Sequence, residues 1–179
     1  MESKIFVKTF SVLLTISLLF ICGCKSSGSI SGGAWVTKGG GQSDILRGIE
    51  VALCKGSTKE MIEKERDVKI AAEVAIVKQD SPDIEPLAYM EYNRYDLLPL
   101  KEMNEVAAKN AIKVVKTNID GKYLFEEVPY GYYILYAYCE SSFSKIYWLI
   151  PIKVASRKTI NMDFDNSNAE EVLNKHTNY

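Results

Sequence analysis

The sequence predicts a mainly β protein, an antiparallel β-sandwich that carries an inserted helical hairpin. Short segments in which apolar and polar residues alternate, separated by turn residues, predict the sandwich. A segment between about 57 and 110, in which charged and apolar residues recur at helical spacing, predicts the insertion. The chain has 179 residues, a length that suits a single domain with a substantial core.

The N-terminal residues are typical of a secretion signal. Lys4 and Lys8 supply positive charge, and residues 10–21 are almost entirely apolar. A stretch of roughly twelve residues suits the apolar core of a signal peptide, and it is shorter than the roughly twenty residues of a membrane-spanning helix. We therefore expect residues 1–23 to be a signal peptide.

A lipid attachment motif ends this segment. Ile21-Cys22-Gly23-Cys24 resembles a lipobox, in which an aliphatic residue and a small residue precede an obligatory cysteine, although Cys22 departs from the usual middle residue. In a bacterial lipoprotein that cysteine thiol accepts a diacylglyceryl lipid. We expect this lipid on Cys24 and no other cofactor; the alternative is a signal cut elsewhere. The predicted location is the cell envelope, on either face of an outer membrane or on the outer face of a plasma membrane.

The charge of the mature chain excludes one class of partner. Removal of residues 1–23 leaves 20 basic and 22 acidic side chains, a net charge of −2. This balance gives no electrostatic basis for nucleic-acid binding, so the expected attachment to the membrane comes from the lipid. Residues 24–29 are rich in Ser and Gly and are predicted to form a lipidated tether.

The sandwich is expected over residues 30–168. Residues 49–53 alternate as a half-buried strand does, and residues 132–138 carry aromatic side chains on both faces, as in a strand covered on both sides. Further strands are expected around 146–152 and 159–164, the former at an edge or a bulge because Pro151 lacks an N–H donor. Residues 169–179 are predicted to be a polar C-terminal tail.

Turn residues predict how the strands connect. Asp120-Gly121 is a strong hairpin signal, and Pro129-Tyr130-Gly131 marks the next turn. We expect a meander of three antiparallel strands over about 110–139.

The insertion begins with Lys59 and Glu63 at four-residue spacing, as on an exposed helix. The apolar run 68–77 fits a helix or a strand. Leu100, Met103, Ala107 and Ala111 recur at helical spacing. These patterns predict a helical hairpin inserted after the second strand.

The segment from Asp120 to Leu135 resembles a known family. It matches every position of D-G-x-[FY]-x-F-x-x-[LV]-P-x-G-x-Y-x-L, the motif of the carboxypeptidase regulatory-like domain. Residues 30–32 and 48–53 are similar to the family's first two strands. The resemblance implies an immunoglobulin-like or prealbumin-like (transthyretin-like) sandwich, which is grouped with carbohydrate-binding folds, and an accessory or adhesive role. The motif residues serve turns and packing, so they are specific for a fold and not for a ligand.

No residue pattern supports catalysis or a metal site. His176 is the only histidine and lies in the polar C-terminal segment. Ser142 and Lys145 have the spacing of a Ser-Lys hydrolase, but at an expected turn and not at the start of a helix. Asp163–Asn168 lacks the glycine and the glutamate of a calcium loop and is better explained as a capped turn. We therefore expect no enzyme.

Two cysteines remain in the predicted domain. By strand parity, Cys54 lies opposite Leu53, whereas Cys139 lies on the face of Leu135. If both leucines point into the core, the thiols point apart and no disulfide forms; a disulfide remains the alternative.

Tyrosines supply the one candidate binding surface. Tyr89, Tyr92 and Tyr95 recur every three residues and could stack on sugar rings, although packing of the insertion on the sandwich is the commoner use of such a stripe. The predicted function is a membrane-anchored lipoprotein with a non-catalytic binding or structural module for a glycan or an envelope protein. The alternative is a lipoprotein subunit of an envelope-spanning secretion or transport assembly.

Overall fold

The computed structural model describes residues 26–38, 40–142 and 144–175. The predicted signal peptide, Cys24 and His176 lie outside the described residues. Within these ranges, no helix combines the length and the apolar character that crossing a membrane requires.

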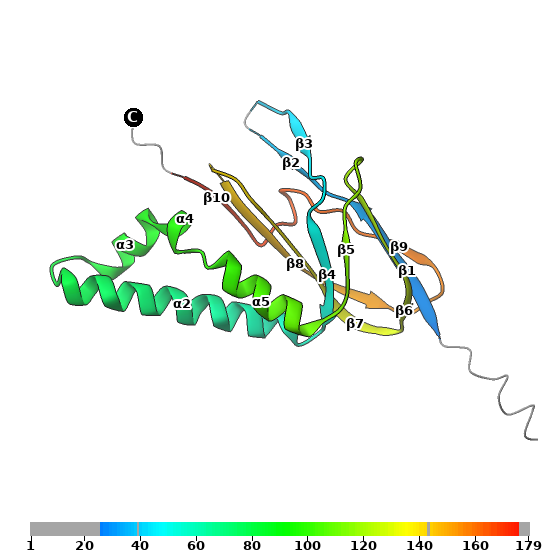
Figure 1. Ribbon diagram of the computed structural model, residues 1–179, viewed down its shortest axis with the longest axis horizontal. Helices are drawn as coiled ribbons and strands as arrows, with labels where there is room; N and C mark the ends of the chain where they lie inside the picture. Colours follow the sequence, from blue (N-terminus) through cyan, green and yellow to red (C-terminus); the bar gives the residue numbers. More distant parts are fainter. Residues whose placement is uncertain (1–25, 39, 143, 176–179) are drawn as a thin grey trace, which may run out of the picture.

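The described residues form a β-sandwich with helices at one end, which confirms the predicted fold class (Figure 1). Its larger sheet has the strand order β10-β8-β7-β4-β5 and its smaller sheet the order β6-β1-β9, while β2 and β3 form a separate hairpin. The pairing of β1 with β9 is parallel, and the other strand pairings are antiparallel. The strands are β1 (Ser27–Gly33), β2 (Trp35–Thr37), β3 (Ser43–Ile45), β4 (Glu50–Lys55), β5 (Ala111–Lys116), β6 (Lys122–Pro129), β7 (Gly131–Glu140), β8 (Ser144–Val154), β9 (Thr159–Asn161) and β10 (Glu171–Asn174).

The inner strands of the larger sheet, β4, β7 and β8, are buried on both faces, because they lie between the smaller sheet and the helices. In β4, Val51 and Leu53 face the first core, between the two sheets, whereas Ala52 and Cys54 face the second core, under the helices. β7 alternates in the same way. This explains why the sequence of β7 carries aromatic side chains on both faces.

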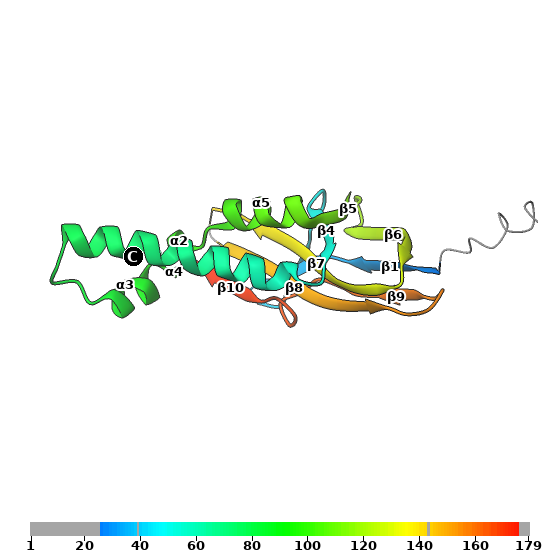
Figure 2. The same cartoon turned by 90° about the horizontal axis from the view of Figure 1, so that it is seen from below.

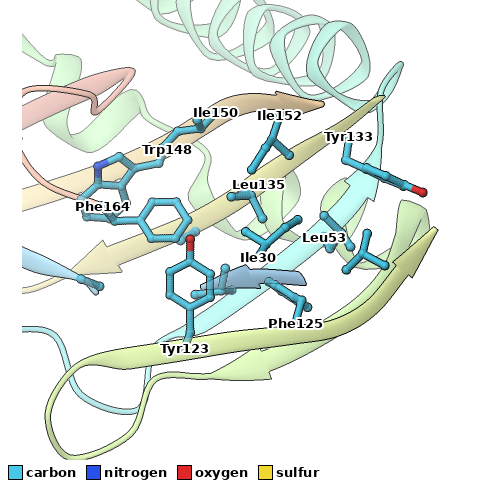
Figure 3. Close-up of a cluster of buried hydrophobic side chains, with 14 of the residues drawn as sticks. Ile30, Leu53, Tyr123, Phe125, Tyr133, Leu135, Trp148, Ile150, Ile152 and Phe164 are labelled. Atoms are coloured by element: carbon cyan, nitrogen blue, oxygen red, sulfur yellow. The ribbon is translucent and has the colours of Figure 1, made fainter. Parts of the chain in front are cut away.

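The first core contains most of the large side chains (Figure 3). Trp148 from β8 meets Phe164 edge to face, with 5.6 Å between ring centroids, and its indole N–H donates to the carbonyl of Asp165 at 2.8 Å. Tyr123 packs on Phe164, and its hydroxyl donates to the carbonyl of Met162 at 2.5 Å. Each such ring contributes roughly 1.5–3 kcal/mol through burial, and its polar atom is satisfied at the edge of the core.

The helices are α2 (Thr58–Asp80), α3 (Pro86–Tyr92), α4 (Arg94–Leu97) and α5 (Leu100–Asn110). α5 buries Leu100, Met103 and Ala107 against the sheet, as their spacing predicted. α2 buries only Thr58 and Ile62 in its first turns, and the ambiguous run 68–77 is helical. In both views the outer part of α2 and α3 extend beyond the sandwich (Figures 1 and 2).

The predicted meander over 110–139 is wrong. The turn at Asp120-Gly121 exists, with the N–H of Gly121 donating to the carbonyl of Asn118 at 3.0 Å. However, β5 pairs with β4, and β6 pairs with β1 in the other sheet. The turn is a corner between sheets, because Tyr123 enters the core from one sheet and Val115 from the other. Gly121 has a φ of 71°, and a Cβ there would lie 2.6 Å from Ile45.

Three predicted boundaries also change. The hairpin of β2 and β3 precedes β4, so the helices follow the fourth strand and not the second. The polar tail contains a strand, because β10 pairs with β8 and its Leu173 packs on the second core. The tether is shorter than residues 24–29, because β1 begins at Ser27. Gly28 is not a flexible-linker residue: a Cβ there would lie 2.4 Å from the carbonyl oxygen of Ser156.

Candidate functional site

The outer helical segment contacts the sandwich mainly through α4, at Arg94 and Tyr95. We call residues 67–97, which comprise most of α2 together with α3 and α4, the arm. Pro86 starts α3, where its missing N–H costs no hydrogen bond, and the Glu85 side chain caps the helix by accepting from the N–H of Ala88 at 2.7 Å. The local sequence therefore turns the chain back along α2 and leaves a space between the two helices.

This space is a groove along α2. Two adjoining hollows of about 400 Å³ and about 570 Å³ share Asp67, Ile70 and Met90, so they are continuous. We call them together the arm groove. Its floor along α2 is aliphatic, with Ile70, Val74 and neighbouring alanines, and Leu87 and Met90 of α3 form the opposite wall.

Charged side chains of both signs lie at the inner end of the arm groove. Arg66 donates to the Tyr147 hydroxyl at 2.9 Å and pairs with Asp67 at 2.9 Å. Partial burial opposes its charge, but these two hydrogen-bond partners raise the pKa of Arg66 above its ordinary value, so the guanidinium stays charged. On the other side Arg94 pairs with Glu171 of β10. This end can therefore contact either sign of charge.

Several large apolar side chains on the arm face solvent. Val68, Ile76 and Leu87 are 55%, 54% and 64% exposed. Apolar residues are spread around α2 over 68–77, a pattern typical of a helix that is covered on several sides. Leu87 lines the arm groove, whereas Val68 and Ile76 line neither hollow.

The three predicted stacking tyrosines do not form one exposed row. Tyr95 is buried in α4, where its hydroxyl donates to the carbonyl of Ser141 at 2.7 Å and its ring lies under the Lys145 ammonium at 4.9 Å. Tyr89 is half-buried on α3, and Tyr92 is 56% exposed. Tyr95 therefore serves to pack the insertion on the sandwich, as the alternative interpretation held.

The other sequence candidates have structural roles. Lys145 is buried, and its ammonium donates to the carbonyl of Leu98 at 3.3 Å. This hydrogen bond holds the segment between α4 and α5 against β8. Ser142 is exposed in a bend. Asp163–Asn168 is a capped turn, in which Asp165 accepts from the N–H of Ser167 at 2.7 Å. The described residues contain no His, Cys, Asp or Glu cluster that could hold a metal ion.

Cys54 and Cys139, the cysteines among the described residues, are free and lie on opposite sides of the larger sheet. Cys54 is buried in the second core, and Cys139 packs against the first. This arrangement confirms the parity argument. Burial raises the pKa of the Cys54 thiol to about 12, which makes it an inert core residue.

Sequence reasoning missed the arm groove and the contact between Arg66 and Tyr147. The residues that line the groove floor were visible as part of the apolar run 68–77. The run fits a helix and a strand equally well, and a strand would have been placed in the sandwich. Recognising the pair of Arg66 and Tyr147 requires the position of α2 relative to β8, which local patterns do not specify.

No protein-family model matches the chain, and no curated protein matches it. Solved structures give weak likenesses. A protein of Pseudomonas aeruginosa proposed to bind carbohydrate is 18% identical, with a TM-score of 0.44, over 82% of this chain and 94% of that one. The minor pilin of Streptococcus agalactiae is 13% identical, with a TM-score of 0.42, over 86% and 46%. The major pilin subunit of Bacillus cereus is 11% identical, with a TM-score of 0.36, over 85% and 31%. All three TM-scores are below 0.5, so these likenesses carry no argument about what the chain binds.

Proposed function

We propose that the chain is a membrane-anchored lipoprotein whose non-catalytic sandwich module binds an envelope protein through the arm groove. The observation that carries this proposal is the aliphatic groove between α2 and α3, which no other part of the described chain fills. The anchor is the lipid predicted on Cys24.

The chemistry of the arm groove suits a protein segment better than a glycan. Its aliphatic floor follows α2 and can accept the apolar face of a helix, a recurring mode of peptide recognition. Arg66, Arg94 and Glu171 can fix the register of such a segment through charge complementarity. Sugar rings are usually stacked on exposed aromatic faces, and Tyr95 is withdrawn from solvent.

Photo-crosslinking in intact cells tests this proposal. A photoreactive residue at position 74 lies in the arm groove, and the matched control at Ala72 lines neither hollow. We expect a discrete protein adduct from position 74 and a much weaker one from position 72. An Ile70→Glu variant that stays folded should lose the adduct. Equal crosslinking at both positions, or retention of the protein on glycan alone, would contradict the proposal.

The anchor is tested separately. A Cys24→Ala variant should lose the lipid mass and should either leave the membrane fraction or accumulate uncut. Metabolic labelling with a fatty acid measures this directly. Unchanged labelling of the variant would refute lipidation of Cys24.

A second candidate function is a lipoprotein subunit of an envelope-spanning assembly. It is favoured by β5, which lies at an edge of the larger sheet within the described residues and exposes Ile112 and Val114. An edge strand with exposed apolar side chains offers a second contact surface, which a subunit with several neighbours requires. Crosslinks from position 112 to a different protein than those from position 74 would support the assembly.

A further inference from the structure

The end of the sandwich nearest the predicted lipid is built from the start of β1 and two loops. Ser26 accepts a hydrogen bond from the N–H of Tyr130 at 3.0 Å, so the start of β1 lies beside the turn between β6 and β7. Gly28 lies against the carbonyl of Ser156, which places the loop 155–158 there too. We call residues 26, 129–132 and 153–158 the tether end. It lies opposite the arm along the long axis of the molecule (Figures 1 and 2).

Very little chain separates Cys24 from this surface. Strand β1 begins at Ser27, three residues after Cys24. An extended chain spans at most about 3.6 Å per residue, so Ser27 can lie no more than about 11 Å from Cys24. Because Ser27 and Gly28 are fixed in the sheet, they cannot lengthen the tether. A lipid on Cys24 would therefore hold the tether end at the membrane surface.

The exposed side chains of the tether end suit such a surface. Tyr132 is 69% exposed and Tyr130 is 40% exposed. The Lys153 ammonium lies 5.0 Å from the centroid of the Tyr132 ring, and Arg157 and Lys158 are exposed in the adjoining loop. Tyrosine is enriched at membrane interfaces because its ring is apolar and its hydroxyl is polar. Basic side chains near the surface are attracted to anionic lipid headgroups.

Nearby acidic residues limit the electrostatic attraction of the tether end to anionic lipid. Glu126 and Glu127 are exposed near the end of β6 and offset part of the positive charge of Lys153, Arg157 and Lys158. The short connection to Cys24 is therefore the main constraint, and the basic side chains add a preference for anionic lipid.

We propose that the tether end is a membrane-contact surface, in which Tyr130 and Tyr132 sit among the lipid headgroups while Lys153, Arg157 and Lys158 contact anionic ones. The inference rests on the proposed lipid anchor at Cys24. The membrane-contact surface adds an orientation to the lipid anchor. A lipoprotein with a long flexible tether would have no fixed orientation, whereas this one would hold its arm away from the bilayer.

Fluorescence quenching in the full lipoprotein tests this surface. The protein is purified from membranes and reconstituted in vesicles of phosphatidylethanolamine and phosphatidylglycerol that contain lipids with a nitroxide headgroup. Tyr132→Trp places a reporter at the tether end, and Tyr92→Trp is the matched control on the arm. Emission from Trp35 and Trp148 is common to both variants and is subtracted. We expect loss of most of the added emission in Tyr132→Trp and almost none in Tyr92→Trp.

Flotation of the same vesicles separates the two hypotheses. Protein that floats but shows equal quenching in both variants overturns the membrane-contact surface and leaves the lipid anchor standing. Protein that does not float refutes the anchor itself. A Gly/Ser spacer inserted between Cys24 and Ser27 should preserve flotation and relieve the quenching. Unchanged quenching when phosphatidylcholine replaces phosphatidylglycerol would overturn the role of the basic side chains.

Discussion

α2 buries one aliphatic side chain, Ile62, and the truncation of this side chain should be costly. Ile62 is fully buried in the second core, and Thr58 is the only other residue that α2 buries. Ile62→Ala removes three carbons, which lose about 2.4 kcal/mol at roughly 0.8 kcal/mol each. The cavity left behind adds to this loss, and the higher helix propensity of Ala returns a few tenths of a kcal/mol. We expect the free energy of unfolding to fall by about 3 kcal/mol.

For a chain of this size each kcal/mol lowers the melting temperature by roughly 2–4 °C, so Ile62→Ala should melt about 6–12 °C lower. Thermal and urea unfolding followed by circular dichroism measure the change. Met61→Ala is the matched control, because Met61 is the preceding residue of α2 and is exposed; its effect should stay within about 0.5 kcal/mol. Equal melting temperatures for the two variants would refute the described docking of α2.

Three further predictions concern the sheet, the cysteines and the arm. Gly32→Ala should separate β1 from β9 and lower the urea midpoint sharply, because a Cβ there would lie 1.8 Å from the carbonyl oxygen of Met162; a native midpoint would contradict that packing. Cys54 should resist iodoacetamide at pH 8 and react in urea, as mass spectrometry can show. Because burial raises the Cys54 pKa from 9.0 to about 12, its contribution to stability is complete below pH 9 and is lost as the pH rises toward 12; an unchanged alkaline stability curve in Cys54→Ala would refute this. Lys145→Met keeps the apolar stem but loses the hydrogen bond to Leu98 and the contact with the Tyr95 ring, and should cost about 1–3 kcal/mol in urea unfolding; no loss would contradict its role.

The sequence predicted the strands that carry large apolar side chains. In β8, Trp148, Ile150 and Ile152 face the first core as their alternation required. Pro151 lies opposite Ile134 of β7, and its other side has no strand partner, because β10 pairs with β8 only as far as Tyr147. The two apolar faces of β7 predicted a sheet covered on both sides. Side-chain parity is a property of the strand itself, so these features could be inferred without knowing the fold.

The sequence-based predictions were wrong where the structure depends on contacts between residues that are distant in sequence. The turn at Asp120-Gly121 is specified locally, but whether it joins neighbouring strands or two sheets depends on the pairing of β6 with β1. Strand β10 has only four residues, and its position is stabilised by pairing with β8. Gly28 lies in a Ser/Gly-rich segment that resembles a linker. A glycine is nevertheless required there, because the carbonyl oxygen of Ser156 comes too close for a Cβ. None of these partners lies near in sequence.

The positions of the tether end and the arm groove together set the height at which a partner would bind. Between Val154 at the tether end and Tyr147, strand β8 spans about 23 Å. Arg66 contacts Tyr147, and the arm groove continues from there along α2 to Lys78, about a further 18 Å at 1.5 Å per residue. If the tether end lies on the bilayer, the groove stands roughly 25–40 Å above it. A protein segment that fills the groove must therefore project that far from the same membrane or come from a structure opposite it. A spacer in the tether would let the height of the groove vary without altering the groove itself. If such a spacer abolished crosslinking from position 74, binding of the partner would depend on the fixed height and not on affinity alone.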